Sequence, residues 1–196
     1  PVVRLPSERE EEARRLSNHQ IFLNRQRPQM INQIHALCVE NGLTEITKKD
    51  LKTESGRAAV LEQMTGIYWE LAENHCCVLA TIEARLSLVK ERVRQALLER
   101  NDEAEILMSI PGVGPMAALA YLGFVGTEAR FANPAQVSYY VGMVPRIEMS
   151  GTSVHRMGHI TKQGSPALRR ALIQAALAAV RSPLGTHFRV VYDRIA

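Results

Sequence analysis

The chain has 196 residues, of which 46% are hydrophobic, 22% charged and 5% aromatic, a balance that supports a packed core and excludes collagen-like, low-complexity and disordered classes. The net charge of +4 is unevenly distributed, because residues 1–105 carry 15 basic and 17 acidic side chains, whereas residues 141–196 carry eight basic and two acidic ones. This excess of positive charge at the C-terminal end predicts a polyanionic partner there.

Targeting and redox signals are weak. No apolar run approaches the roughly 18 to 20 residues that cross a bilayer, and the acidic start PVVRLPSEREEE is unlike a signal peptide. We therefore expect a cytoplasmic protein without a membrane partner.

Cys38, Cys76 and Cys77 show neither CxxC spacing nor an even count, which predicts reduced structural thiols. The sequence begins at Pro1 and reads like an internal part of a longer protein.

The first predicted helix begins at Glu8, because Ser7 and Glu10 have the spacing of a capping box. A heptad pattern follows, which predicts a long amphipathic helix ending near Gly42. The repeating residues are Leu16, Leu23, Met30 and Leu37. Pro28 lies inside this pattern and predicts either a kink or a break between two helices.

A second long helix is predicted after a polar connecting segment, residues 42–56, which can contain a short helical turn. Apolar residues at steps of three, four or seven, without an interior proline, predict one helix over about 57–101. At 1.5 Å per residue this helix would be about 65 Å long. The two helices most simply form an antiparallel hairpin or coiled coil over residues 1–105, or they pair with a second chain.

The last third, residues 106–196, predicts a compact helical domain, so that the whole chain is mainly all-α. The sequence IPGVGPMAA predicts two helices joined by a tight turn at Gly112 and Gly114. Further helices are predicted at 137–143, 167–181 and 186–194. Between them, residues 144–164 predict an exposed, polar, glycine-rich segment.

The glycine turn has two interpretations. It is similar to the hairpin of helix-hairpin-helix units, in which backbone amides contact a phosphate without reading bases. It also fits a plain turn between closely packed helices. The motif alone does not decide between them.

The segment 145–164 combines two serines, two histidines and three basic residues, and Arg169 and Arg170 follow it. A hydroxyl nucleophile that attacks a phosphodiester needs an accessible Oγ and fixed cations, which this mixture provides. By composition alone, a solvated basic loop is the simpler interpretation. His155 and His159 fit surface residues better than a metal site, because the pair does not lie on a helix.

The order of motifs carries a resemblance over most of the chain. Residues 110–181 contain IPGVGPMAALAYLGFVG, RFANPAQVSYYVGMVPR, SG and GHITKQGSPALRRALIQAALAAVR. This stretch resembles the C-terminal transposase domain of the DEDD-type insertion-sequence transposases, the insertion-sequence one-ten family, which is related to the Piv and MooV DNA invertases. Upstream, RLPSEREEEARRLSNHQIFLNRQRPQMINQIHALCVENGL resembles the coiled coil that follows the RuvC-like domain in that family.

The resemblance implies a recombinase that cuts and rejoins DNA strands, in some members guided by a bridge RNA. In this family a serine just before a glycine attacks the phosphodiester and becomes covalently linked to the DNA end. That position matches Ser150, with Ser153 as the lesser alternative. The glycine turn and the basic positions give the predicted nucleic-acid-binding residues, which are Gly112, Gly114, Arg146, Arg156, Lys162, Arg169 and Arg170.

The resemblance also implies Mg²⁺ in the full-length protein, held by four acidic residues of the RuvC-like domain. Asp50, Asp102 and Asp193 have no matching context, so we assign no cofactor or metal ligand to this chain. The chain alone is therefore expected not to catalyse transposition. The expected partners are DNA, a bridge RNA in some members, and a second copy bound through the coiled coil. The alternatives are a non-catalytic helical module for nucleic-acid binding and oligomerisation, and a purely structural coiled-coil protein.

Overall fold

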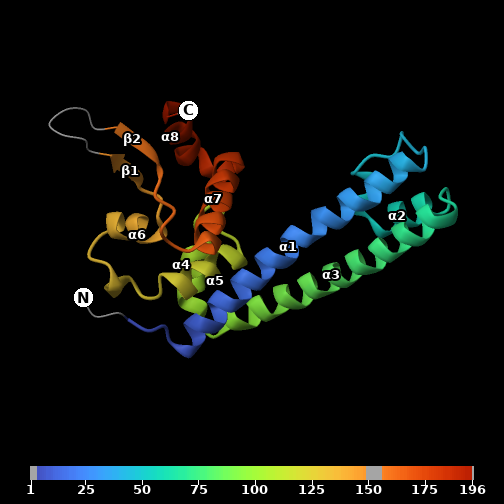
Figure 1. Ribbon diagram of the computed structural model, residues 1–196. Helices are drawn as coiled ribbons and strands as arrows, with labels where there is room; N and C mark the ends of the chain where they lie inside the picture. Colours follow the sequence, from blue (N-terminus) through green and yellow to red (C-terminus); the bar gives the residue numbers. More distant parts are fainter. Residues whose placement is uncertain (1–3, 149–155, 196) are drawn as a thin grey trace. The chain divides into compact units, whose positions relative to one another are not determined.

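The structure is a computed structural model that describes residues 4–148 and 156–195. These residues form mainly α-helices and one two-stranded sheet, which confirms the predicted all-α class (Figure 1). The elements are α1 (Glu8–Glu40), α2 (Glu54–Leu61), α3 (Gly66–Leu98), α4 (Asn101–Met108), α5 (Pro115–Phe124), α6 (Pro134–Val141), β1 (Pro145–Glu148), β2 (Arg156–Ile160), α7 (Pro166–Arg181) and α8 (Thr186–Ile195). Three short 3-10 helices accompany them, η1 (Asp50–Lys52), η2 (Glu128–Arg130) and η3 (Pro183–Gly185).

The chain divides into two compact units. Unit 1 comprises residues 1–18 and 92–196, and unit 2 comprises residues 19–91. Helices α1 and α3 each contribute to both units, whereas the domain boundary predicted from the sequence lies between residues 105 and 106. That boundary stays a prediction. None of the helices in the described ranges combines the length and apolar character needed to cross a bilayer.

Helix α1 begins as predicted. The amide of Glu10 donates to Ser7 Oγ at 3.3 Å, and the amide of Ser7 donates to Glu10 Oε2 at 2.9 Å, which is the reciprocal pairing of a capping box. Of the two alternatives predicted at Pro28, the break between two helices is wrong, because α1 continues through it to Glu40, whereas the kink stays a prediction. Proline removes one backbone hydrogen bond, and the buried side chains of Leu23 and Ile31 on either side of Pro28 hold the helix in place.

In unit 2, α1 and α3 lie side by side and run antiparallel. Arg27 Nε of α1 pairs with Glu83 Oε1 of α3 at 2.9 Å, while further along α1 the side chain of Cys38 shares a core with Ala72 and Leu79. The prediction of one helix over 57–101 is wrong, because the chain turns between α2 and α3 and a further turn separates α3 from α4. The first turn carries the buried side chain of Met64 into the same core.

A buried arginine joins the elements of unit 2. The Arg57 side chain is only 6% exposed, and its Nη2 atom pairs with Glu83 Oε2 at 2.9 Å. Its Nη1 atom donates to the carbonyl of Leu51 at 3.2 Å. The guanidinium therefore fixes α2 to both α3 and η1. A buried charge is tolerated here because it has an acidic partner and a hydrogen bond.

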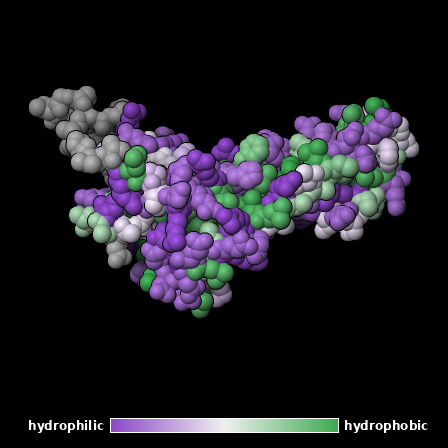
Figure 2. Space-filling view, turned by 90° about the horizontal axis from the view of Figure 1, so that it is seen from below, coloured by the Kyte–Doolittle hydropathy of each residue, from purple (hydrophilic) through white to green (hydrophobic). Residues whose placement is uncertain are grey.

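Unit 2 also exposes apolar side chains. Figure 2 shows hydrophobic residues on the surface of the helical pair, and the exposed set includes Phe22, Ile67, Leu71, Val78 and Leu88. Contiguous exposed apolar side chains often mark association surfaces. Pairing with a second copy through these helices stays a prediction.

In unit 1, α5 is the buried central helix. Most of its side chains are buried, including Leu119, Leu122 and Phe124, and it packs against α4 and α7 (Figure 1). The first turns of α1 also reach it, because Ala13 lies directly against Gly123. Its length of ten residues and apolar composition fit a helix that is covered on several sides.

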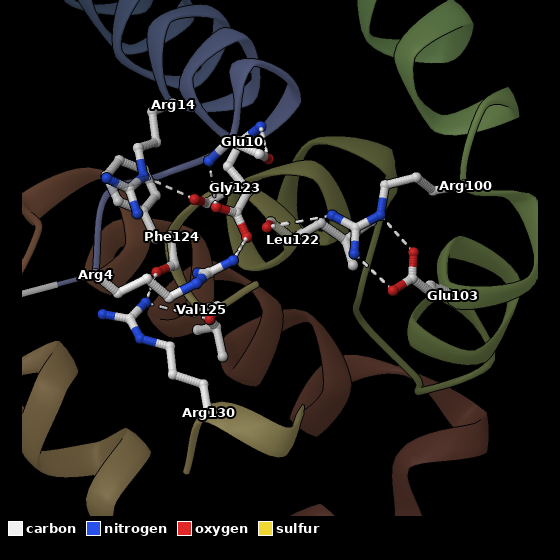
Figure 3. A network of polar contacts seen from close by, with 11 residues as sticks. Arg4, Glu10, Arg14, Arg100, Glu103, Leu122, Gly123, Phe124, Val125 and Arg130 are labelled. Carbon is white, nitrogen blue, oxygen red and sulfur yellow. Dashed lines mark hydrogen bonds and ion pairs between the residues drawn. The ribbon is translucent and has the colours of Figure 1, made fainter. Parts of the chain in front are cut away.

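Three arginines bind the carbonyl groups at the end of α5 (Figure 3). Arg14 Nε donates to the carbonyl of residue 123 at 2.7 Å, and Arg100 Nη1 donates to that of residue 122 at 3.4 Å. Arg130 Nη1 donates to the carbonyls of residues 124 and 125 at 3.0 and 3.3 Å. The last carbonyls of a helix lack partners within it and carry partial negative charge, so cations there stabilise the helix end. The network joins α1, α4 and η2 to α5.

Candidate nucleic-acid interface

The glycine turn between α4 and α5 packs directly on α7. Gly112 has a φ of +87°, and a Cβ at this position would lie 2.2 Å from the carbonyl oxygen of Ala175 and 2.5 Å from the amide of Ala179. Only glycine fits this backbone and this contact. Gly114 is different, because it is the N-cap of α5 and a Cβ there would meet open space. The turn therefore has a packing role at Gly112 and leaves the start of α5 accessible at Gly114.

The segment after α6, for which the sequence predicts an exposed, polar, glycine-rich stretch and no strands, forms a β-hairpin. Strands β1 and β2 pair antiparallel, with Pro145 opposite Ile160 and a register irregularity after Pro145. Pro145 opens its strand, a position where the missing N–H is tolerated. Ser150 and Ser153 belong to residues 149–155, which connect the two strands in sequence and lie outside the described residues.

Backbone hydrogen bonds continue the hairpin beyond its strands. The amide of Thr161 donates to the carbonyl of Val144 at 2.9 Å, and the amide of Lys162 donates to that of Gly142 at 3.0 Å. The chain then passes the end of α6 so closely that a Cβ at Gly164 would lie 2.1 Å from the Tyr140 carbonyl oxygen. The base of the hairpin is therefore fixed to α6 through the backbone.

Arg169 lies at this junction. Its Nη1 atom donates to the carbonyl of Val141 at 2.9 Å and to the carbonyl of Gly164 at 2.7 Å. The side chain, on the first turn of α7, thus joins the end of α6 to the end of the hairpin segment. Sequence analysis predicted that Arg169 contacts nucleic acid, and the structure gives its guanidinium these two internal partners. Contact of the same group with a phosphate stays a prediction.

Three of the other basic residues predicted to bind nucleic acid differ from Arg169 in being exposed. Arg146 on β1, Lys162 after β2 and Arg170 on α7 are exposed, and their side chains form no hydrogen bond or ion pair with the side chains and backbone groups that the structure describes. Arg156 begins β2. Unpaired exposed cations on a hairpin and on the helix that follows it suit the oxygens of a phosphodiester backbone.

Aromatic rings hold one further arginine that sequence analysis missed. Besides its carbonyl contacts, the guanidinium of Arg130 lies 5.0 Å from the ring centroid of Phe131 and 4.4 Å from that of Tyr140. These are cation–π distances. Arg130 therefore links the end of α5 to α6, the helix that precedes the hairpin.

In the described part of the chain, the potential metal ligands and the cysteine thiols do not form a cluster. There, no group of three or more His, Cys, Asp or Glu residues could hold a metal ion. Burial raises the pKa of the Cys38 and Cys76 thiols, so both are protonated at neutral pH. A hydrogen bond to Glu73 raises the pKa of the exposed Cys77 thiol. Such thiols are poor nucleophiles and poor metal ligands.

Comparison with known proteins finds similarity to transposases, and the C-terminal part of the chain matches a family model. Residues 104–192 match the family described as "Transposase IS116/IS110/IS902 family". The chain is 29% identical over 170 residues to a "Probable family 20 transposase" of Pseudomonas aeruginosa, a match that covers 81% of this chain and 48% of that protein. It is 29% identical over 161 residues to the "Transposase for insertion sequence element IS1111A" of Coxiella burnetii, covering 81% of this chain and 44% of the relative.

A third relative shares only the C-terminal part. The "Pilin gene-inverting protein" of Moraxella bovis is 33% identical over 79 residues, which are 40% of this chain and 24% of that protein. The chain thus spans about half the length, or less, of these curated relatives. The matched family region contains the glycine turn, the hairpin and α7.

Proposed function

We propose that this chain, whose residues 104–192 match the "Transposase IS116/IS110/IS902 family", is the nucleic-acid-binding and serine-bearing part of a DNA transposase. The family match over residues 104–192 is the observation that carries the proposal. In this proposal Ser150 is the nucleophile, and it works together with a RuvC-like domain of the full-length protein. The exposed cations of the hairpin and of α7 bind the DNA backbone.

The proposed reaction is a transfer of a phosphodiester bond. The Oγ atom of Ser150 forms a bond to phosphorus and loses its proton, while one backbone P–O bond breaks and the departing sugar oxygen takes up a proton. The product is a covalent protein–DNA link, which a strand hydroxyl can later reverse to rejoin DNA. Arg146 and Lys162 are suited to stabilise the charge that develops on the non-bridging oxygens, because both are exposed on the same hairpin.

Metal and RNA enter the proposal only through the full-length protein. Mg²⁺ would supply further charge stabilisation at the phosphate, but the described residues of this chain form no site for it. The resemblance stated in the sequence analysis assigns it to the acidic residues of the RuvC-like domain. A bridge RNA is a second polyanion that the same basic surface could hold, and pairing with a second copy of the chain would bring two hairpins to one DNA.

A test for covalent adducts examines the serine assignment. The full-length protein is incubated with labelled DNA that carries the ends of its own element, and SDS-resistant complexes are separated by electrophoresis. Wild-type protein should give an adduct, Ser150→Ala should give none, and the matched control Ser153→Ala should retain it. All three should bind the DNA equally in a mobility-shift assay.

The outcomes separate the hypotheses. Adducts that persist in Ser150→Ala but vanish in Ser153→Ala would move the nucleophile to Ser153. Adducts in both single variants and in the double variant would rule out a nucleophilic serine in this segment. DNA binding without any wild-type adduct would favour the alternative of a non-catalytic module for nucleic-acid binding and oligomerisation.

A further inference from the structure

Helix α7 has two faces of opposite character. Its inner face contacts α5 and the glycine turn through the buried residues Ala167, Leu168, Ala175 and Ala179. Its outer face is exposed and consists of Arg170, Ile173, Gln174, Leu177 and Arg181. These five residues, called the outer α7 face below, follow steps of three and four and therefore lie on one side of the helix.

The charge on this face is not balanced within the described structure. Helix α7 contains no Asp or Glu, and residues 166–195 contain five arginines against the single acidic residue Asp193. Arg169 is engaged with backbone carbonyls, and Arg189 Nε donates to the carbonyl of Val180 at 3.0 Å. Over the described ranges, Arg170 and Arg181 have no hydrogen bond or ion pair. An exposed helix more commonly pairs its arginines with carboxylates one turn away.

The spacing of the two arginines suits an extended polyanion. They are eleven residues apart, which corresponds to about 16 Å along the helix axis at 1.5 Å per residue. Phosphates follow one strand at about 3.4 Å of rise, so the two guanidinium groups span roughly five phosphates. Between them Gln174 adds a neutral donor. Ile173 and Leu177 are 40% and 36% exposed and lie between the two arginines.

We propose that the outer α7 face binds the backbone of a nucleic acid, independently of base sequence, through Arg170, Gln174 and Arg181. This inference rests on the proposed function, because it takes the partner to be a nucleic acid, and it extends the binding surface of α7 from Arg170 to Gln174 and Arg181 and makes its contacts independent of base sequence. Guanidinium groups bind phosphate oxygens in a bidentate manner. Contacts limited to phosphates carry no sequence preference.

The test measures binding of the 196-residue chain to labelled duplexes of unrelated sequences by fluorescence anisotropy, at salt concentrations from about 50 to about 200 mM. Arg170→Gln and Arg181→Gln should each weaken binding about tenfold near 0.1 M salt, by the same factor on every sequence. Each should also lower the slope of log affinity against log salt by about 1. Arg25→Gln, at an exposed arginine of unit 2, is the matched control and should bind like the wild type.

Controls for correct folding and for the type of binding partner accompany the binding curves. The melting temperatures of all three variants should equal that of the wild type, because exposed arginines are removed. Wild-type affinity and salt slope in Arg181→Gln would overturn the inference while leaving the proposed function intact, provided that Arg146→Gln weakens binding. A wild-type chain that binds no nucleic acid would overturn both. A change of oligomeric mass in Leu177→Glu, with unchanged binding in the arginine variants, would show a protein interface instead.

Discussion

Removing the Arg169 side chain is the sharpest test of how the hairpin is held. In the wild type, Nη1 of Arg169 donates to the carbonyls of Val141 and Gly164 at 2.9 and 2.7 Å. The Arg169→Ala variant loses both bonds, and the carbonyl of buried Val141 loses a charged donor. We expect the junction between α6, the hairpin and α7 to loosen.

The magnitude follows from the two hydrogen bonds. A bond with one charged partner contributes about 1.5 to 3 kcal/mol, and leaving a buried acceptor unpaired costs a similar amount. Because both bonds share one nitrogen, we expect a total loss of about 2 to 4 kcal/mol in the free energy of unfolding rather than twice a full bond. For a protein of this size that corresponds to a fall in melting temperature of about 4 to 16 °C.

Two assays check this value. Circular dichroism at increasing temperature gives the melting transition, and amide hydrogen exchange reports the junction itself through the amides of Thr161 and Lys162, which are bonded to Val144 and Gly142. If exchange occurs through opening of this junction, it should accelerate about 30- to 1,000-fold in Arg169→Ala. The neighbouring Arg170→Ala variant, at an exposed side chain, should change the free energy of unfolding by less than about 0.5 kcal/mol. Equal melting and exchange in the two variants would refute the assignment of Arg169 to this junction.

Two further predictions concern unit 1. Gly112→Ala should destabilise the fold by about 2 to 5 kcal/mol, because its φ of +87° and the contact with Ala175 exclude a Cβ. The control Gly114→Ala should cost less than about 1 kcal/mol. Urea unfolding of both variants checks this prediction, and equal unfolding midpoints would contradict it. Burial opposes the ionised form of Glu10, but hydrogen bonds from Arg4 and from the amide of Ser7 outweigh it and lower the pKa of this carboxyl. Its contribution to stability is therefore present at neutral pH and is lost as the pH falls below the usual glutamate range, so Glu10→Gln should show a smaller loss of melting temperature between about pH 7 and about pH 3 than the wild type.

The sequence predicts the helical fold well where local signals act alone. The capping pair of Ser7 and Glu10 gives the start of α1, and Pro166 gives the start of α7. The turn between α2 and α3 escapes notice for a physical reason. Leu61, Met64 and Tyr68 keep steps of three and four across it, so the apolar pattern runs on although the backbone does not.

The hairpin was missed for a different reason. Strands of four and five residues in a two-stranded sheet need not bury one face, so the alternation of apolar and polar residues that identifies a strand is weak. The opposite fates of Arg169 and Arg170 are also invisible in the sequence. Adjacent residues of one type differ by about 100° around a helix, and the carbonyls that Arg169 binds belong to residues 5 and 28 positions away.

The arginines of unit 1 differ in whether their partners cancel their positive charge. Arg4 and Arg92 pair with glutamates, whose charge cancels theirs. Arg14, Arg130 and Arg169 donate to backbone carbonyls, which are neutral dipoles and leave the full charge in place. These internal arginines still attract a polyanion over roughly 10 Å at 0.1 M salt, although their donors are engaged. Under the proposed function, the internal arginines contribute to the attractive field, while exposed groups such as Arg170 and Arg181 make the phosphate contacts.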